Sequence, residues 1–449
     1  MRDAVLWTFT RAGVSRSFLA AALVAVLLPS AANADGILRN GVGARAMALG
    51  GAVVASPDGP LDSMAINPAG LTLLTRPTLD LGITAVMAHG SFTNRANNDG
   101  DLSSDPGFIP DGAFGMRVGP VSVGLAVTTV SGLEANWDYV DTPGGAGGTS
   151  YGRQEHKSRI LVLRSAVGVA YQVTSNFSIG VTGGLIYNEN ALKAPYIFQT
   201  QPQLRGLKTL LDLETRGFGA NATAGLLYRP HRSVQLGLSY TSPTHVHTEG
   251  EATGNVGAQL ATLGLALRPD FRYDAEVDTH FPQMVAAGLS WDVLPRWRLN
   301  FQIDWIDWSS SFNRLPIKLT NGNNADINGI VGSDTIKEEP RLSWHDRFVY
   351  RVGVEYAVLD NLSLRLGYAY GQSPVPDATL TPLTGVIMEH TIGAGAGYRW
   401  DQFRIDLGYQ YDVPTSRHVG QSKLLSGEYS DSRTEVGMHS VGLTGSFRF

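Results

Sequence analysis

Alternation of apolar and polar residues runs through most of this chain from about residue 77 onward, and it constrains the fold more than any other feature. One apolar ladder consists of Trp297, Leu299, Phe301, Ile303 and Trp305. The positions between them hold Arg298, Asn300, Gln302 and Asp304. A period of two places successive side chains on opposite faces of a β-strand. The chain is therefore expected to be all-β, built from strands with one apolar and one polar face.

The length of the ladders separates two kinds of all-β protein. They run to about ten residues, which is what a tilted membrane-spanning strand needs, whereas strands of soluble sandwiches have about 5–6. Aromatic residues such as Trp305, Tyr356 and Tyr370 collect at ladder ends, where the interfacial girdles of membrane barrels lie. Only 17% of the residues are charged, against about 25% in typical soluble domains. These features favour a transmembrane antiparallel β-barrel over a soluble sandwich.

The connections between ladders also alternate in length. Turns such as 174–176 are short and polar, whereas segments such as 131–157 and 190–215 are long. Short turns on one side and long loops on the other are typical of outer-membrane barrels. The last ladder ends at Phe449, an aromatic C-terminus that resembles the sorting signal read by the barrel-assembly machinery. We therefore expect that machinery as a partner, and outer-membrane lipids and lipopolysaccharide as surroundings.

The N-terminus has the pattern of an export signal. Arg2, Arg11 and Arg16 precede the apolar stretch 18–28, and Ala32-Asn33-Ala34 supplies small residues at the expected cleavage spacing. A membrane anchor is the alternative, but this stretch is shorter than the roughly 20 residues that a spanning helix needs. We expect residues 1–34 to be a signal peptide.

Composition excludes several other functions. The chain has no cysteine, so disulfide scaffolds and cysteine-ligated metal sites are excluded. Its formal net charge is −5, which does not suggest a nucleic-acid partner. His245 and His247 lie in an expected loop, where such a pair is usually solvated. We expect no metal and no cofactor.

Residues 35–76 differ from the rest of the chain. They are rich in Gly and Ala, moderately apolar, and without a long alternating ladder. Such a segment is too apolar for a solvated tail and is placed where it could fold into the barrel lumen as a plug. Gly393, Gly395 and Gly397 alternate within a later ladder, and we interpret them as small lumen-facing positions that make room for it.

Several motifs in order resemble one family. Gly43-Ala44-Arg45-Ala46 and Asn67-Pro68-Ala69-Gly70 look like the N-terminal hatch of the FadL/TodX family of outer-membrane long-chain fatty-acid and hydrocarbon transporters. Further resemblances follow in the expected order, at Phe281-Pro282, Asp304-Trp305, Trp344-His345-Asp346, Arg365-Leu366-Gly367-Tyr368 and Ser373-Pro374-Val375-Pro376. The similarity extends from about residue 35 to Phe449 and is weakest over 131–275.

The resemblance implies a monomeric barrel of about fourteen strands over 77–449, with the hatch over 35–76 in its lumen. The hatch residues carried over by the motifs are Gly43, Arg45, Asn67, Pro68 and Ala69. The family also has an inward kink in its third strand, which opens a lateral exit into the membrane. Our candidates for that kink are Thr128, Thr129, Ser131 and Gly132, with an ordinary strand running into a loop as the alternative.

Apolar residues in the expected long loops are candidates for ligand capture. The leucines of segment 190–215 are spaced by three and four, which is typical of a one-sided helix. In a soluble protein they would be ordinary core, but an apolar patch on an exposed loop marks a binding site. The candidate ligand-binding residues are Trp137, Tyr139, Phe198, Leu204, Leu207 and Leu211.

The features together predict a passive transporter that takes up long-chain fatty acids or other hydrophobic small molecules and is not an enzyme. A general diffusion porin would explain the barrel but not a Gly/Ala-rich plug. An outer-membrane lipid hydrolase is a further alternative, although the chain has no G-x-S-x-G nucleophile elbow.

Overall fold

Fourteen antiparallel strands close into one barrel in the computed structural model, which describes residues 36–98, 100–102 and 106–449. The expected signal peptide over 1–34 lies outside these residues. The ring closes where β1 (Thr78–Thr93) pairs with β19 (Ser432–Arg448), from Thr78↔Arg448 to Thr93↔Arg433. The expectation of an all-β closed barrel of about fourteen strands is confirmed.

The wall follows chain order around the ring. Between β1 and β19 it consists of β3 (Gly107–Val118), β4 (Val121–Val140), β5 (Arg153–Thr174), β6 (Phe177–Ile197), β7 (Lys208–His231), β8 (Val234–Thr241), β11 (Met284–Leu294), β12 (Trp297–Ile306), β15 (Arg347–Leu359), β16 (Leu362–Gly371), β17 (His390–Trp400) and β18 (Phe403–Val419). β9 (Thr244–Asn255) continues β8, and β10 (Asp270–Phe281) leads into β11. β9 and β10 pair with each other over their whole length and extend the wall at the end with the long loops.

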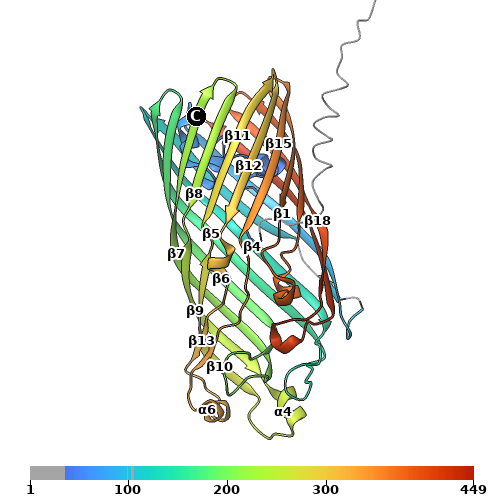
Figure 1. Cartoon of the computed structure of the whole chain (residues 1–449). Coiled ribbons are helices and arrows are strands. Elements are labelled where there is room, and N and C mark those ends of the chain that lie inside the picture. The colour runs from blue at the N-terminus through green and yellow to red at the C-terminus, as the bar shows by residue number, and fades with distance from the viewer. Residues whose placement is uncertain (1–35, 99, 103–105) are drawn as a thin grey trace, which may run out of the picture. The chain divides into compact units, whose positions relative to one another are not determined.

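Short hairpin turns lie at one end of the barrel and long connections at the other. The C-terminus lies at the short-turn end, and α4 (Gly257–Leu263) and α6 (Ala325–Val331) lie at the opposite end (Figure 1). Gly119 and Asp401 have φ of 64° and 51° in two of the short turns. A positive φ is favoured in tight hairpins because it matches the twist of the flanking strands.

Several strands are much longer than the ladders that predict them. β7 has 24 residues and β5 has 22, so the wall continues far into the segments expected to be loops. The expected loop 190–215 is largely the ends of β6 and β7. His245 and His247, also expected in a loop, lie in β9. The leucine spacing in 190–215 is not helical, because Leu210, Leu211 and Leu213 lie in β7, where they pair with both β6 and β9.

The remaining elements are short. They are α2 (Ala44–Ala48), α3 (Pro60–Ala65), α5 (Trp308–Ser311), β2 (Gly100–Leu102), β13 (Ile317–Thr320), β14 (Ile336–Glu338), and the 3-10 helices η1 (Pro68–Leu73), η2 (Asp377–Thr379), η3 (Pro382–Thr384) and η4 (Leu425–Gly427). No helix among the described residues is long and apolar enough to cross a membrane.

The side chains of the wall are arranged inside out relative to a soluble protein. Alternating apolar residues face outward and are exposed, for example Leu125 at 57% and Leu366 at 63%. The polar residues between them are buried inside, such as Asn300, Gln302 and Asp304. This is the dyad pattern of a barrel whose outside faces lipid and whose lumen is polar.

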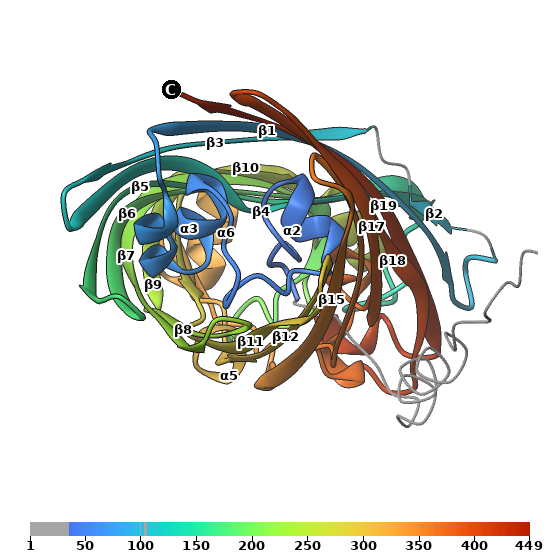
Figure 2. The ribbon, with the colours of Figure 1, turned by 90° about the horizontal axis from the view of Figure 1, so that it is seen from above.

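The N-terminal segment 36–76 lies against the inner side of the ring. Figure 2 shows α2 and α3 within the circle of strands, seen from above. Contacts from this segment reach each of the fourteen wall strands among the described residues. Gly393 and Gly395 leave room for this segment. A Cβ at Gly393 would lie 2.3 Å from Met47 O, and a Cβ at Gly395 would lie 2.6 Å from Ala48 Cβ.

Candidate functional site

The N-terminal segment and the wall are joined by buried ion pairs centred on Arg45. Its guanidinium lies 2.9 Å from Asp62 Oδ2 within the segment and 3.4 Å from Glu355 Oε2 of β15. Arg365 of β16 also pairs with Glu355 and reaches Asp406 of β18 at 2.7 Å. Arg45 is only 3% exposed, and a buried charge is stable only when it is paired and hydrogen-bonded. The wall carboxylate Glu355 therefore helps to hold α2 in place.

The Asn67-Pro68-Ala69 turn provides a second attachment. The Asn67 side chain accepts the Ala69 N–H at 3.2 Å and donates to Val54 O at 2.8 Å and to Leu226 O of β7 at 3.0 Å. This asparagine is fully buried and caps η1, which begins at Pro68. Its bond to a wall carbonyl requires close approach, and Gly225 permits it because a Cβ there would lie 2.1 Å from Asn67 Oδ1. Gly43, another expected hatch residue, has φ of 83° next to Leu61.

The third strand of the wall is irregular at the residues expected to form a kink. The register of β4 against β5 shifts between Thr129 and Ser131, so Val130 is the extra residue of a β-bulge. Thr128, Thr129 and Ser131 are buried, and Gly132 is exposed. Bulges bend a strand and locally disrupt its ladder.

On its other side, β4 separates from β3 at the same level. The pairing of β3 with β4 ends at Gly112↔Val127, and β4 next has a partner at Trp137, which pairs with Leu102 of β2. Among the residues that the structure describes, none pairs with 128–136 along this edge. The wall is thus interrupted between β3 and β4.

Arg39 and Asp111 satisfy backbone groups that this interruption frees. The Asp111 carboxylate accepts the Thr129 N–H at 3.0 Å, and Arg39 donates from Nη1 to Thr129 O at 3.1 Å and from its N–H to Val130 O at 3.2 Å. Arg39 and Asp111 also pair with each other at 2.8 Å. Unpaired backbone groups are costly where water is absent. The N-terminal segment therefore stabilises the interruption.

A cavity of about 80 Å³ lies beside the interruption. Its apolar lining comes from Leu38, Val86, Ile109, Gly132, Met388 and Met438. A cavity of about 150 Å³ accommodates benzene. This cavity is smaller, so an apolar ligand would have to widen it in order to pass.

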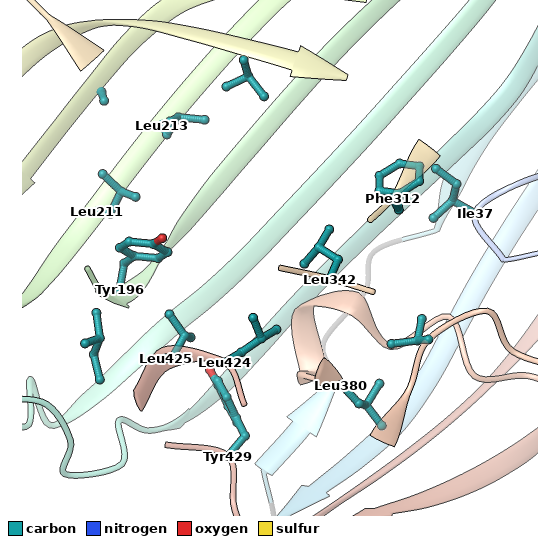
Figure 3. Close-up of a cluster of buried hydrophobic side chains, with 14 of the residues drawn as sticks. Ile37, Tyr196, Leu211, Leu213, Phe312, Leu342, Leu380, Leu424, Leu425 and Tyr429 are labelled. Carbon is teal, nitrogen blue, oxygen red and sulfur yellow. The ribbon is translucent and has the colours of Figure 1, made fainter. Parts of the chain in front are cut away.

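All six expected ligand residues join one buried apolar cluster among the loops and the loop-side ends of the strands. Trp137, Tyr139, Phe198, Leu204 and Leu211 belong to it, and Leu207 packs against it. Figure 3 shows part of this cluster, with Tyr196 and Leu211 on one side and Leu424 and Tyr429 nearby. Trp137 Nε1 donates to Pro382 O at 3.1 Å, and the hydroxyls of Tyr139 and Tyr429 lie 3.0 Å apart. The patch expected to be exposed is therefore enclosed by the loops.

The buried Lys208, at the start of β7, connects several segments at the loop end of the barrel. Its Nζ lies 2.6 Å from Asp141 Oδ1 and 2.8 Å from Glu428 Oε1, and it is 0% exposed. Its N–H donates to Gln259 Oε1 at 2.9 Å, and Gln259 Nε2 donates to Ala146 O at 2.7 Å. One lysine thus connects segments near 141–149, 208, 259 and 428.

The sequence does not predict the roles of Arg39, Asp111, Lys208 and Glu338. Glu338 is, like Asp141 and Glu428, a buried carboxylate at the loop end of the barrel. The ion-pair partners of Lys208 lie 67 and 220 positions away, and Arg39 and Asp111 are 72 positions apart. No local motif marks such pairs. Among the described residues, no group of three or more potential ligands is arranged to hold a metal ion.

A family assignment follows from comparison with known proteins. Residues 24–449 match the family described as "Outer membrane protein transport protein (OMPP1/FadL/TodX)". The chain belongs to this family. It is accordingly an outer-membrane transport protein and not an enzyme, as expected.

Individual relatives of this FadL/TodX-family protein are distant. The chain is 22% identical to the "Long-chain fatty acid transport protein" of Salmonella typhi, covering 81% of this chain and 82% of that one. It is 24% identical to "Alkane uptake protein A" of Marinobacter nauticus over 46% of this chain and 43% of that one.

Solved structures share the fold. A Pseudomonas aeruginosa FadL homologue superposes with a TM-score of 0.74 at 17% identity, covering 92% of this chain and 100% of that one. The Pseudomonas putida toluene transporter TodX gives a TM-score of 0.72 at 19% identity, covering 93% and 100%.

Proposed function

We propose that this protein takes up long-chain fatty acids or other hydrophobic small molecules by passive, ligand-gated passage and releases them sideways into the membrane. In this account the apolar cluster captures the ligand, residues 36–76 act as a hatch in the lumen, and the interruption between β3 and β4 is the exit. The ligand class is supported by the relatives, which are described as transporting fatty acids, taking up alkanes and transporting toluene.

The observation that carries the proposal is the interrupted wall beside a largely apolar cavity. Backbone groups in a membrane wall need partners, so an interruption persists only where other groups replace the missing strand. Arg39 and Asp111 do so at Thr129 and Val130. An interruption supported in this way is a built feature and suits a lateral passage.

Energetics favour a sideways route for such a ligand. Each CH₂ transferred from an apolar site into water costs about 0.8 kcal/mol. A twelve-carbon chain would therefore lose on the order of 10 kcal/mol on entering an aqueous channel. Direct passage from the cavity into the bilayer avoids that loss.

A general diffusion porin fits the interior less well. Porins keep an aqueous channel, whereas segment 36–76 here contacts the whole ring and is fixed by buried ion pairs such as Arg45–Asp62. We further propose that the protein acts as a monomer. Its apolar exterior would contact outer-membrane lipids and lipopolysaccharide, and its Phe449 terminus would be read by the barrel-assembly machinery.

Filling the proposed exit tests this function. A Cβ at Gly132 would lie 3.3 Å from Ile109 Cδ1, so the ring of a Gly132→Phe variant would occupy the cavity. We expect fatty-acid uptake by cells carrying this variant to fall by about tenfold, which corresponds to a barrier about 1.4 kcal/mol higher. Binding of the same fatty acid to the purified variant should be unchanged, because the apolar cluster is intact.

Gly183→Phe is the matched control. Gly183 is an exposed wall position where a Cβ would meet nothing within 4 Å. The control should take up fatty acid like the wild type. Full uptake by folded Gly132→Phe protein would refute exit at this point. Measurable ion conductance and uptake of small sugars by the wild type would favour a porin.

A further inference from the structure

Glu338 is a buried carboxylate held almost entirely by the backbone of another loop. It ends β14 and is 3% exposed. Its oxygens accept the N–H groups of Gln199 at 3.0 Å, Thr200 at 3.1 Å and Gln201 at 2.7 Å. The hydroxyl of Tyr196 donates to Oε2 at 3.0 Å. We call these three N–H groups and this hydroxyl the carboxylate cradle.

The cradle stabilises the carboxylate of Glu338 by hydrogen bonds and without a cation. Within the part of the chain that the structure describes, Glu338 makes no ion pair with lysine or arginine, whereas its neighbour Glu339 pairs with Arg314 at 3.0 Å. Successive backbone N–H groups form concave sites that bind anions, and hydrogen bonds to an ionised group are stronger than neutral ones. These donors recognise a carboxylate group as such, and nothing in them is specific for glutamate.

The cradle lies beside the apolar cluster. Tyr196 supplies its hydroxyl and packs its ring against Phe198 at 5.7 Å between centroids. Phe198 and Leu204 follow in the same loop and are 4% and 2% exposed. Ile336, two residues before Glu338, is buried in the same cluster. One loop therefore offers N–H donors for a carboxylate beside apolar side chains for a hydrocarbon chain.

We propose that the carboxylate cradle is the binding site for the carboxylate of a fatty acid, and that Glu338 occupies it as an internal competitor until the ligand displaces it. This inference rests on the proposed function, since it requires a ligand with an apolar chain. It adds a specificity: an acid gains charge-assisted hydrogen bonds in the cradle by displacing Glu338, whereas a neutral ester or an alkane gains no charge-assisted bond there.

The consequence for affinity follows from competition. A site that is available only when Glu338 leaves binds its ligand with an apparent affinity equal to the intrinsic affinity multiplied by the fraction of time that the site is free. Removing the competing carboxylate should therefore strengthen binding of acids selectively. A purely structural role for Glu338 predicts the opposite, because loss of the hydrogen bonds that it accepts from four donors would loosen the loop for every ligand.

Glu338→Ala and Glu338→Gln test the proposal in purified full-length protein. The quantity to measure is the equilibrium binding of palmitate and of methyl palmitate. Heat-modifiable gel migration checks that the barrel is folded. We expect the dissociation constant for palmitate to fall by about tenfold in Glu338→Ala, a change that equals 1.4 kcal/mol. The value for methyl palmitate should not change, and Glu338→Gln should behave in the same direction because it also removes the charge.

Two further variants separate the cradle from general effects. Glu339→Ala removes the adjacent exposed carboxylate and should leave the ratio of acid to ester affinity at the wild-type value. Tyr196→Phe, placed in the Glu338→Ala background, removes one donor and should weaken palmitate binding without affecting the ester.

The possible outcomes separate the role of the cradle from the proposed function. It is overturned if the Glu338 variants change acid and ester affinity equally, change neither, or weaken acid binding alone. If the wild type binds neither palmitate nor its ester, the proposed ligand class itself fails. Binding of both by the wild type with an unaltered acid-to-ester ratio in the variants leaves the transport function standing and rejects only the role of the cradle.

Discussion

Lys208 shows how a single residue can hold the loop end of the barrel together. A lysine with no exposure is stable only beside compensating charge, and here Asp141 and Glu428 both contact its Nζ. Two carboxylates around one lysine leave one negative charge in excess in a buried site. Burial, with Asp141 adding to it and Lys208 opposing it, raises the pKa of Glu428 from 4.5 to about 8.

The raised pKa predicts a pH-dependent loop. Because Glu428 binds its proton more tightly when the loop is packed than when it is open, its contribution to stability is complete below about pH 4.5 and is lost as the pH rises through about 8. The opening equilibrium of segment 422–430 should rise by up to about tenfold per pH unit within this window. Hydrogen exchange of its backbone amides from pH 5 to 9, corrected for intrinsic rates, measures this.

Glu428→Gln is the control for that prediction. A neutral side chain of the same size should make the corrected exchange of 422–430 independent of pH in this range. The groups facing Glu428 are Lys208, Asp141, Tyr139 and Tyr429. An unchanged pH profile in Glu428→Gln would assign the effect to one of these neighbours.

Elements as a whole are more predictable than these residues. The irregularity of β4 falls at Thr129–Ser131, inside the stretch that the sequence indicates, and the N-terminal segment packs against glycines of the predicted ladder. The leucines of 190–215 mislead because β6 and β7 continue pairing beyond the membrane-facing part, where apolar residues face a loop-covered cluster. Spacing alone does not reveal such a partner. Ion pairs such as Arg39–Asp111 are likewise invisible in local patterns.

The packing of the N-terminal segment against β16 leads to a prediction about the closure of the lumen. A Cβ at Gly367 of β16 would lie 2.1 Å from the backbone of Leu49 and Gly50, so Gly367→Val should push the N-terminal segment off the wall. We expect the barrel to assemble but to show increased ion conductance in planar bilayers. Gly445→Val, at a position with nothing within 4 Å, should conduct like the wild type. Equal conductance of both folded variants would show that the segment does not block the lumen.

At the scale of the whole molecule, alternation in the sequence suffices for the barrel because each strand needs only a neighbour on either side and an apolar outer face. Closure removes every free edge of the sheet, as β1↔β19 does here. The two places where the wall departs from this rule are the extension by β9 and β10 and the interruption between β3 and β4. The second departure carries the proposed path, because it connects the interior to the lipid-facing side.

The path of the ligand can be mapped directly by photo-crosslinking during uptake, with a fatty acid that carries a diazirine at the end of its chain. The account predicts that outer-membrane vesicles illuminated during transport give crosslinked peptides that contain residues 36–41, 107–111 and 128–132, around the interruption and its cavity. Crosslinks confined to the stretches 55–58, 229–235 and 290–298, whose residues line a polar cavity of about 430 Å³ at the short-turn end, would contradict it and indicate exit along the barrel axis.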